Sequence, residues 1–227
     1  MNLLLLNGIQ EILIVFIILL TAIIISKRNL ISLINIFSFQ SLLLSLLIFF
    51  IYIHEHGSVL LIISILTFVS KCIFIPTVLK KTTRLMNIYV DLEYNLFTPI
   101  ASIFTSLILF GAAFFSIFSI KEQLQLDSLD YISAATGISL LLVGMLIIIG
   151  RKKIITKIIG YLVMENGILL MSIFIGELPF LIEVLILMDL LMLIAISAIL
   201  GFGMDSSVEE FHAKLNPFRK WFKKVSK

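Results

Sequence analysis

The fold is decided by apolar runs such as residues 12–25, which read ILIVFIILLTAIII without one charged side chain. The run is apolar all round, so it does not fit the alternating strands of a membrane β-barrel. Crossing the hydrocarbon core of a bilayer takes about 20 helical residues, a length that this run reaches with its flanking residues. The stretch therefore predicts a membrane-spanning helix.

Composition extends this prediction to the whole chain. Of the 227 residues, 60% are hydrophobic and only 14% are charged, and the mean hydropathy is +1.18. That is too little charge to cover a soluble domain of this size. The formal net charge of +3 does not indicate a nucleic-acid partner, because the basic residues sit beside apolar runs. Cys72 is the single cysteine, which excludes an internal disulfide and a cysteine-held cluster. We therefore expect an all-α membrane protein that binds no metal or other cofactor itself.

Seven spans are predicted, at residues 9–26, 30–53, 58–79, 98–120, 130–149, 154–175 and 178–201. Basic residues crowd the connections after the first, third and fifth spans and the tail, whereas the alternate loops contain one, Lys121. The positive-inside rule then places the N-terminus outside and the C-terminus in the cytoplasm, with the chain in the cytoplasmic (inner) membrane. An odd number of spans also requires termini on opposite sides, so count and charge agree.

Three further segments carry expectations. Residues 84–97 mix apolar and acidic side chains and are predicted to lie along the cytoplasmic interface. Residues 203–227 form a basic amphipathic tail, either a headgroup anchor or a docking surface for a cytoplasmic subunit. Pro76, inside the third span, is predicted to kink it.

Four ionisable side chains fall within predicted spans: Lys71, Glu165, Glu183 and Asp189. A charge at the centre of a span costs about 3 kcal/mol, and such residues usually face a bundle interior. Glu165 lies roughly 16 Å and Lys71 roughly 12 Å from the cytoplasmic ends of their spans at about 1.5 Å per residue. Asp189 reaches a depth similar to that of Glu165, and Glu183 lies about 9 Å nearer the outside.

Carboxylates and a lysine at this depth have the chemistry of a proton pathway, because each can change protonation as a proton passes. The alternative is a structural ion pair or interhelical hydrogen bond. Gln40, in the second span, is predicted to play the structural role by bonding to a neighbouring helix.

The stretch from Gly150 to Ile168, which reads GRKKIITKIIGYLVMENGI, resembles component E of hydrogenase-4-type complexes (HyfE). That family is related to the NuoK subunit of complex I and the C subunit of Mrp antiporters. The shared features are a basic turn, a glycine one turn inside the next span, and a Met-x-Asn-small pattern around an intramembrane glutamate. Lys71 followed by Ile75 and Pro76 also resembles a feature of the family.

The resemblance implies a domain organisation. Residues 130–202 would form a NuoK-like three-helix unit, and residues 1–129 an additional four-helix region. In the complex I subunit the glutamate falls two residues after the glycine, where this chain has Leu162. Here it is Glu165, about 60° away on the helix and a turn deeper. The second glutamate of that subunit would fall near Asp189.

The resemblance also implies a function. The chain would be a non-redox membrane subunit of a hydrogenase-4-like, energy-converting complex, contributing to proton or ion translocation coupled to electron transfer. Its partners would be antiporter-like membrane subunits and cytoplasmic subunits with iron–sulfur clusters and a nickel–iron site. The alternatives are a stand-alone secondary transporter, which should show an internal repeat and discontinuous helices, and a passive membrane scaffold. A retinal protein with Lys71 as its Schiff-base lysine is disfavoured, because that lysine leans toward the cytoplasm.

The charge pattern predicts where the two termini lie. Reporter fusions should place the N-terminus outside and the C-terminus in the cytoplasm, because basic connections alternate with nearly non-basic ones. Activity of cytoplasmic and external reporters at each end measures this. Both ends on one side would contradict the seven-span arrangement.

Overall fold

A computed structural model of the chain describes residues 3–55, 57–85, 99–123, 126–151, 153–175, 184, 187–192, 194 and 196. The chain divides into two units, residues 1–189 and 190–227, and the fold and site below belong to the first. Among the described residues the regular structure is helical and contains no strand. Six of these helices are long and apolar enough to cross a membrane. The chain is an all-α, multi-pass membrane protein.

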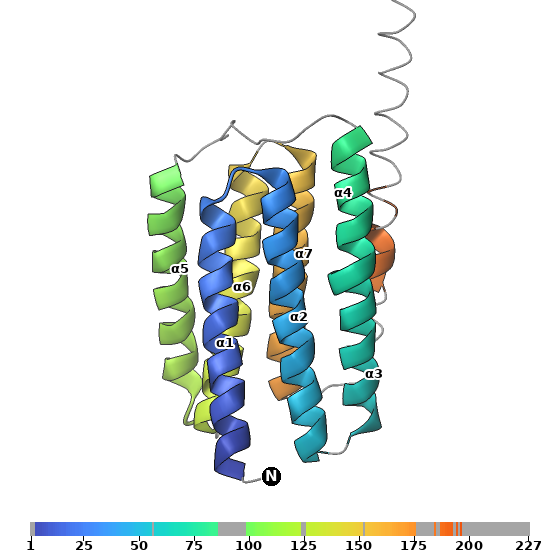
Figure 1. The fold of residues 1–227 in the computed structure, drawn as a ribbon. Coiled ribbons are helices and arrows are strands. Elements are labelled where there is room, and N and C mark those ends of the chain that lie inside the picture. The colour runs from blue at the N-terminus through green and yellow to red at the C-terminus, as the bar shows by residue number, and fades with distance from the viewer. Residues whose placement is uncertain are drawn as a thin grey trace, which may run out of the picture. The chain divides into compact units, whose positions relative to one another are not determined.

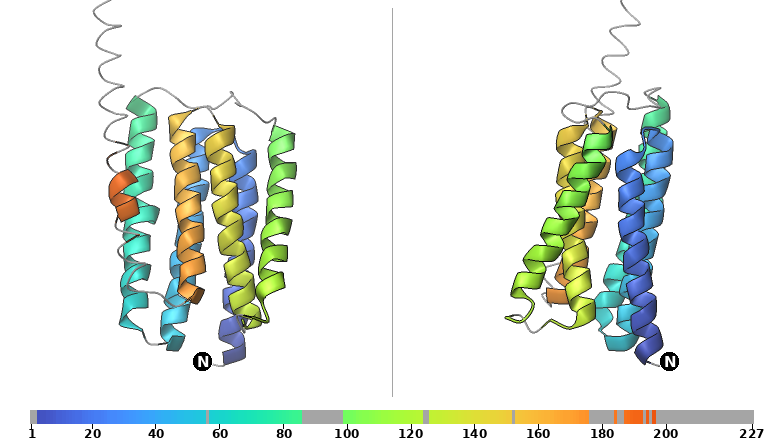
Figure 2. Two further views of the ribbon diagram at one scale, coloured as in Figure 1. Left: turned by 180° about the vertical axis from the view of Figure 1, so that it is seen from behind. Right: turned by 90° about the vertical axis from the view of Figure 1, so that its left-hand side faces the viewer.

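The helices are α1 (Leu3–Ser26), α2 (Leu30–Glu55), α3 (Ser58–Thr67), the π-helical turn η1 (Phe68–Phe74), α4 (Ile75–Leu85), α5 (Pro99–Ile120), α6 (Ser128–Gly150) and α7 (Ile154–Ile175). The segments α3, η1 and α4 follow one another without a break and form a single span. Successive spans run in opposite directions (Figure 1). They form two layers, with α1, α2 and the α3–η1–α4 span in one and α5, α6 and α7 in the other (Figure 2).

The predicted spans agree with the described helices except at their ends. The first helix begins at Leu3 rather than at residue 9, and the third span continues to Leu85 rather than ending at residue 79. Three basic residues assigned to a loop therefore lie on the last turns of α4: Lys80, Lys81 and Arg84. Lysine and arginine are good helix formers, and their long side chains can reach water from the end of a helix. The basic residues therefore did not mark the end of the third span. Residues 86–98, most of the predicted seventh span and the tail lie outside the described residues.

Helices α6 and α7 pack backbone against backbone through two glycine pairs. A Cβ atom on Gly144 would lie 2.6 Å from the carbonyl oxygen of Gly160, and one on Gly167 would lie 2.5 Å from that of Gly137. In both helices the two glycines are seven residues apart, about two turns, so they share one face. Small residues of this kind let membrane helices approach closely enough for van der Waals packing to hold them together.

Polar side chains join the other helices. Gln40 donates through Nε2 to the hydroxyl of Thr21 at 2.7 Å, which links α2 to α1 and confirms the hydrogen bond predicted for this residue. Ser45 on α2 and Ser64 on α3 each donate to the other's carbonyl oxygen at 3.0 Å. These buried bonds satisfy polar groups that would otherwise lie in an apolar environment.

Arg151, in the turn between α6 and α7, caps α1. Its Nη2 donates to the carbonyl oxygens of Ile25 at 2.7 Å and Lys27 at 3.0 Å. A cation at this position compensates both the unpaired carbonyls and the partial negative charge of the helix C-terminus. The contact also fixes the basic α6–α7 turn beside the basic α1–α2 turn, at the same end of the bundle as the end of α4 (Figure 1).

The glycine contacts predict a sharp difference between two substitutions. Gly144→Ala should lower the free energy of unfolding by about 1–3 kcal/mol, because its methyl group would overlap the backbone of α7. Gly111→Ala is the matched control, because a Cβ atom there has nothing within 4 Å. It should be neutral or slightly stabilising, since alanine is the better helix former. Thermal unfolding of the full chain in detergent compares them. Equal melting temperatures would contradict the close approach of α6 and α7.

Candidate functional site: a buried lysine between two carboxylates

Lys71 and Glu165 meet inside the bundle. Lys71 lies on η1 and Glu165 on α7, and their Nζ and Oε1 atoms are 2.9 Å apart. Their side chains are 0% and 3% exposed, so neither charge reaches the surface of the described fold. Two charges shielded from water depend on each other, because an unpaired charge at this depth is costly.

The π-helical turn that carries Lys71 follows from Pro76. Proline has no amide hydrogen, so it cannot bond to the carbonyl of Cys72 one turn earlier. The helix widens before it, and the amide of Ile75 donates to the carbonyl of Ser70, five residues back. The carbonyl of Cys72 instead accepts a hydrogen bond from the Ser38 hydroxyl of α2 at 2.8 Å. At this proline, where the sequence predicts a kink, the structure has a π-helical turn.

Two further side chains hold the lysine in place. Nζ of Lys71 donates to Oδ1 of Asn166 at 3.2 Å, and Nδ2 of Asn166 donates to the hydroxyl of Ser41 at 3.1 Å. Asn166 and Ser41 are buried, and Ser41 comes from α2. The ammonium group therefore has a carboxylate and an amide oxygen as partners, both from α7, and Asn166 carries the polar contacts on to α2.

Asp189 joins the same region through the residue before the lysine. The hydroxyl of Ser70 donates to Oδ2 of Asp189 at 2.6 Å. The hydroxyl of Tyr161 on α7 donates to the sulfur of Met188, the residue before Asp189, at 2.7 Å. The structure therefore brings together three of the four residues predicted for a proton pathway: Lys71, Glu165 and Asp189. The fourth, Glu183, lies outside the described residues.

The carboxyl groups keep free acceptor positions. Oε1 of Glu165 contacts the lysine ammonium. Within the described part of the chain, neither Oε2 of Glu165 nor Oδ1 of Asp189 has a hydrogen-bond donor. A carboxyl group with unfilled acceptor positions can take up a proton and become a donor. The arrangement is chemically able to hold a proton on a carboxyl or on the amine.

Sequence reasoning missed several members of this site. Asn166, Ser70, Ser41 and Tyr161 are uncharged, and such residues are common in membrane helices as hydrogen-bonding contacts between helices. A signal was present for two of them, since Ser70 precedes Lys71 and Asn166 follows Glu165. Nothing in the sequence distinguished Ser41 from the other hydroxyl residues of α2.

No known protein family, curated protein or solved structure matches the chain. The described residues also include no group of three histidine, cysteine, aspartate or glutamate side chains placed to hold a metal ion. The conclusions about function therefore rest on the geometry of the site and on the resemblance seen in the sequence.

The mutual dependence of the pair can be measured with a double-mutant cycle. Lys71→Met and Glu165→Leu should each destabilise the chain by about 3–5 kcal/mol, because each leaves one buried charge without its partner. The double variant should recover much of that loss, since no charge then remains unpaired. Equilibrium unfolding in detergent gives the three values. Strictly additive losses would mean that the two side chains do not interact in the folded protein.

Proposed function

We propose that the chain is a non-redox membrane subunit of a hydrogenase-4-like, energy-converting complex and that its buried cluster forms part of a proton pathway. The observation that carries the proposal is the Lys71–Glu165 contact at 2.9 Å, fully enclosed and beside a second carboxylate. The sequence pattern around Glu165 is the second support for the proposal, because it resembles component E, a relative of the NuoK and Mrp C subunits.

The cluster can relay a proton without exposing a bare charge. Transfer from Nζ of Lys71 to Oε1 of Glu165 converts a charged pair into a neutral amine and a neutral carboxylic acid. Burial narrows the energy difference between these two states, because it disfavours both charged forms. The charged pair is restored when the amine takes up a proton from the side of Ser70 and Asp189 as Glu165 releases its own proton onward. Each cycle moves one proton, and with uptake and release coupled in this way neither group of the pair is left charged alone.

The proposal extends to topology and partners. The chain would have seven spans, with its N-terminus outside and its C-terminus in the cytoplasm of a cell with a cytoplasmic (inner) membrane. Antiporter-like membrane subunits would receive or supply the proton, and cytoplasmic subunits would hold the iron–sulfur clusters and a nickel–iron site. The outward face of α5 is a surface such a membrane subunit could cover, since several of its apolar side chains are more than 60% exposed: Phe104, Leu107, Ile108, Phe115 and Phe118.

The cluster lies across the proposed division of the chain. Lys71, Ser70 and Ser41 belong to residues 1–129, whereas Glu165 and Asn166 belong to the NuoK-like unit at residues 130–202. The first region would therefore supply the amine and the second the carboxyl group.

A passive scaffold is the second candidate, favoured by the hydrogen bonds from Lys71 to Asn166 and from Asn166 to Ser41. A purely structural ion pair would hold α2, η1 and α7 together and would not exchange protons. The two functions differ in what happens when the carboxyl group is replaced without loss of shape.

Glu165→Gln makes that replacement. The amide keeps the shape and can still accept a hydrogen bond from Lys71, so the complex should assemble. Proton movement should fall at least about tenfold relative to electron transfer, because an amide does not exchange a proton at working pH; tenfold corresponds to about 1.4 kcal/mol. Asp189→Asn should weaken coupling less, and Glu165→Asp should restore part of it. The measurement is proton uptake in reconstituted vesicles, alongside electron transfer.

Gln40→Met is the control, because it removes a buried polar bond between α1 and α2 outside the charged cluster. It should leave the ratio of protons to electrons unchanged. Full coupling in an assembled Glu165→Gln complex would refute the relay. Loss of assembly in that variant, with coupling intact in Glu165→Asp and Asp189→Asn, would establish the scaffold.

A further inference from the structure

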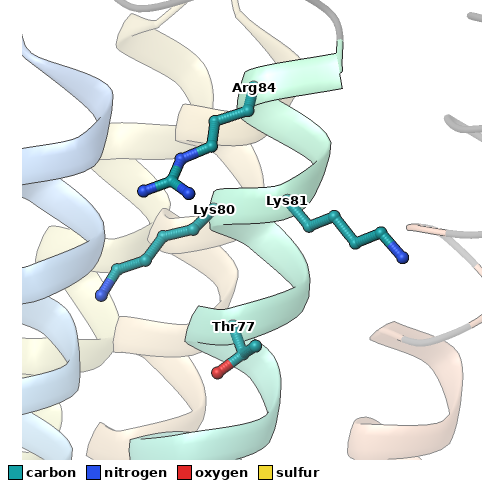
Figure 3. A pocket seen from close by; sticks show the side chains of 4 residues that line it. All are labelled: Thr77, Lys80, Lys81 and Arg84. Atoms are coloured by element: carbon teal, nitrogen blue, oxygen red, sulfur yellow. The ribbon is translucent and has the colours of Figure 1, made fainter.

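The C-terminal end of α4 has a basic hollow outside the buried cluster. Thr77, Lys80, Lys81 and Arg84 line an open hollow of about 320 Å³. Their spacing places them on one face of the helix, since residues three and four apart are neighbours. Figure 3 shows Lys80 and Arg84 extending to one side of α4 and Lys81 to the other, with Thr77 one turn below. Lys80 and Arg84 therefore bring two cations to one side of the hollow, and Lys81 brings a third to its other side.

These cations have no protein counter-charge among the described residues. The described salt bridge joins Lys71 to Glu165, well away from this end of α4. The other described acidic side chains lie within the bundle or toward its opposite end: Glu11, Glu122, Asp127, Asp130 and Asp189. No described acidic side chain is therefore placed to neutralise the cations of the hollow.

The same span is apolar on its outer surface toward the membrane centre. Ile73 and Phe74, which precede Thr77 by one turn, are 52% and 48% exposed. Val69, one further turn away, is 52% exposed. The surface thus changes from basic to apolar along one helix. A molecule with an anionic head and apolar tails would match such a surface.

We propose that this hollow binds the phosphate group of an anionic phospholipid, with acyl chains along the exposed side of η1. Basic pockets of membrane helices bind such headgroups, and each lysine or arginine near the bilayer surface contributes attraction for anionic lipid. A free phosphate ion would use the cations but not the apolar surface beside them. The phospholipid satisfies both.

The test uses the full chain in a mild detergent and native mass spectrometry. Phosphatidylglycerol and phosphatidylcholine are titrated separately, and inorganic phosphate forms a third arm. The test variant is Lys80→Gln/Lys81→Gln/Arg84→Gln. The matched control is Lys27→Gln/Lys153→Gln/Lys157→Gln, which removes three positive charges from the same end of the bundle but none from the hollow.

The wild-type chain should retain phosphatidylglycerol in preference to phosphatidylcholine. The test variant should lose affinity by about fivefold for each charge removed, whereas the control should change little. Photoreactive phosphatidylglycerol should cross-link the wild-type chain within residues 68–84, a readout that does not depend on the variant's folding.

Three results would overturn the proposal. The first is an equal loss in the two variants, which would indicate general attraction to the basic end. The second is binding of inorganic phosphate with the same dependence on the hollow and no preference for lipid. The third is an absence of phosphatidylglycerol binding, or of cross-linking within residues 68–84. That result would favour an acidic protein as the ligand of the hollow.

Discussion

Lys71 and Glu165 share one enclosed position between η1 and α7, and neither charge can stay there without the other. Their contact requires the α3–η1–α4 span to lie beside α7 with the lysine turned inward. Pro76 contributes to this placement of the lysine. It has no amide hydrogen, and the helix before it widens into the π-helical turn that carries Lys71. The carbonyl of Cys72, to which Pro76 cannot donate, accepts a hydrogen bond from Ser38 of α2, so the irregular turn is held from outside its own helix. The buried ion pair thus joins the third span to α7, and the hydrogen bond from Ser38 joins the third span to α2.

The position of α7 is constrained from its other side by the glycine contacts with α6. Gly160 and Gly167 lie roughly 150° around the helix from Glu165 at about 100° per residue, so the glycine face and the carboxylate face point in nearly opposite directions. Close packing on α6 leaves α7 little freedom to rotate or slide, because added bulk at the glycines would overlap backbone atoms. The carboxylate is consequently presented to Lys71 by a helix whose register is fixed elsewhere. Precise placement of a charged group depends on such rigid support.

Much of this could be predicted from the sequence, but not the pairing itself. Length and hydropathy place the spans, and counting residues gives the depths of Lys71, Glu165 and Asp189. Depth does not decide which face a side chain occupies or which helix it meets, and the π-helical turn changes the facing of residues around Lys71 in a way that regular spacing does not anticipate. The seven-residue spacing of glycines in α6 and α7 was a readable signal of close packing. The predicted end of the third span, at residue 79, was wrong, because the basic residues that follow continue the helix to Leu85 instead of ending it.

The distribution of hydrogen bonds bears on what the cluster is for. The ammonium of Lys71 is held by Oε1 of Glu165 and Oδ1 of Asn166, whereas Oε2 of Glu165 and Oδ1 of Asp189 have no hydrogen-bond donor among the described residues. An ion pair that serves only stability repays the cost of burial when its remaining lone pairs are also bonded, and apolar residues of similar volume are often at least as stabilising. A group that exchanges protons has the opposite need, since acceptor positions must stay open for the proton to arrive. The two partners of the amine and the open acceptor positions on Oε2 of Glu165 and Oδ1 of Asp189 are therefore consistent with the proposed relay.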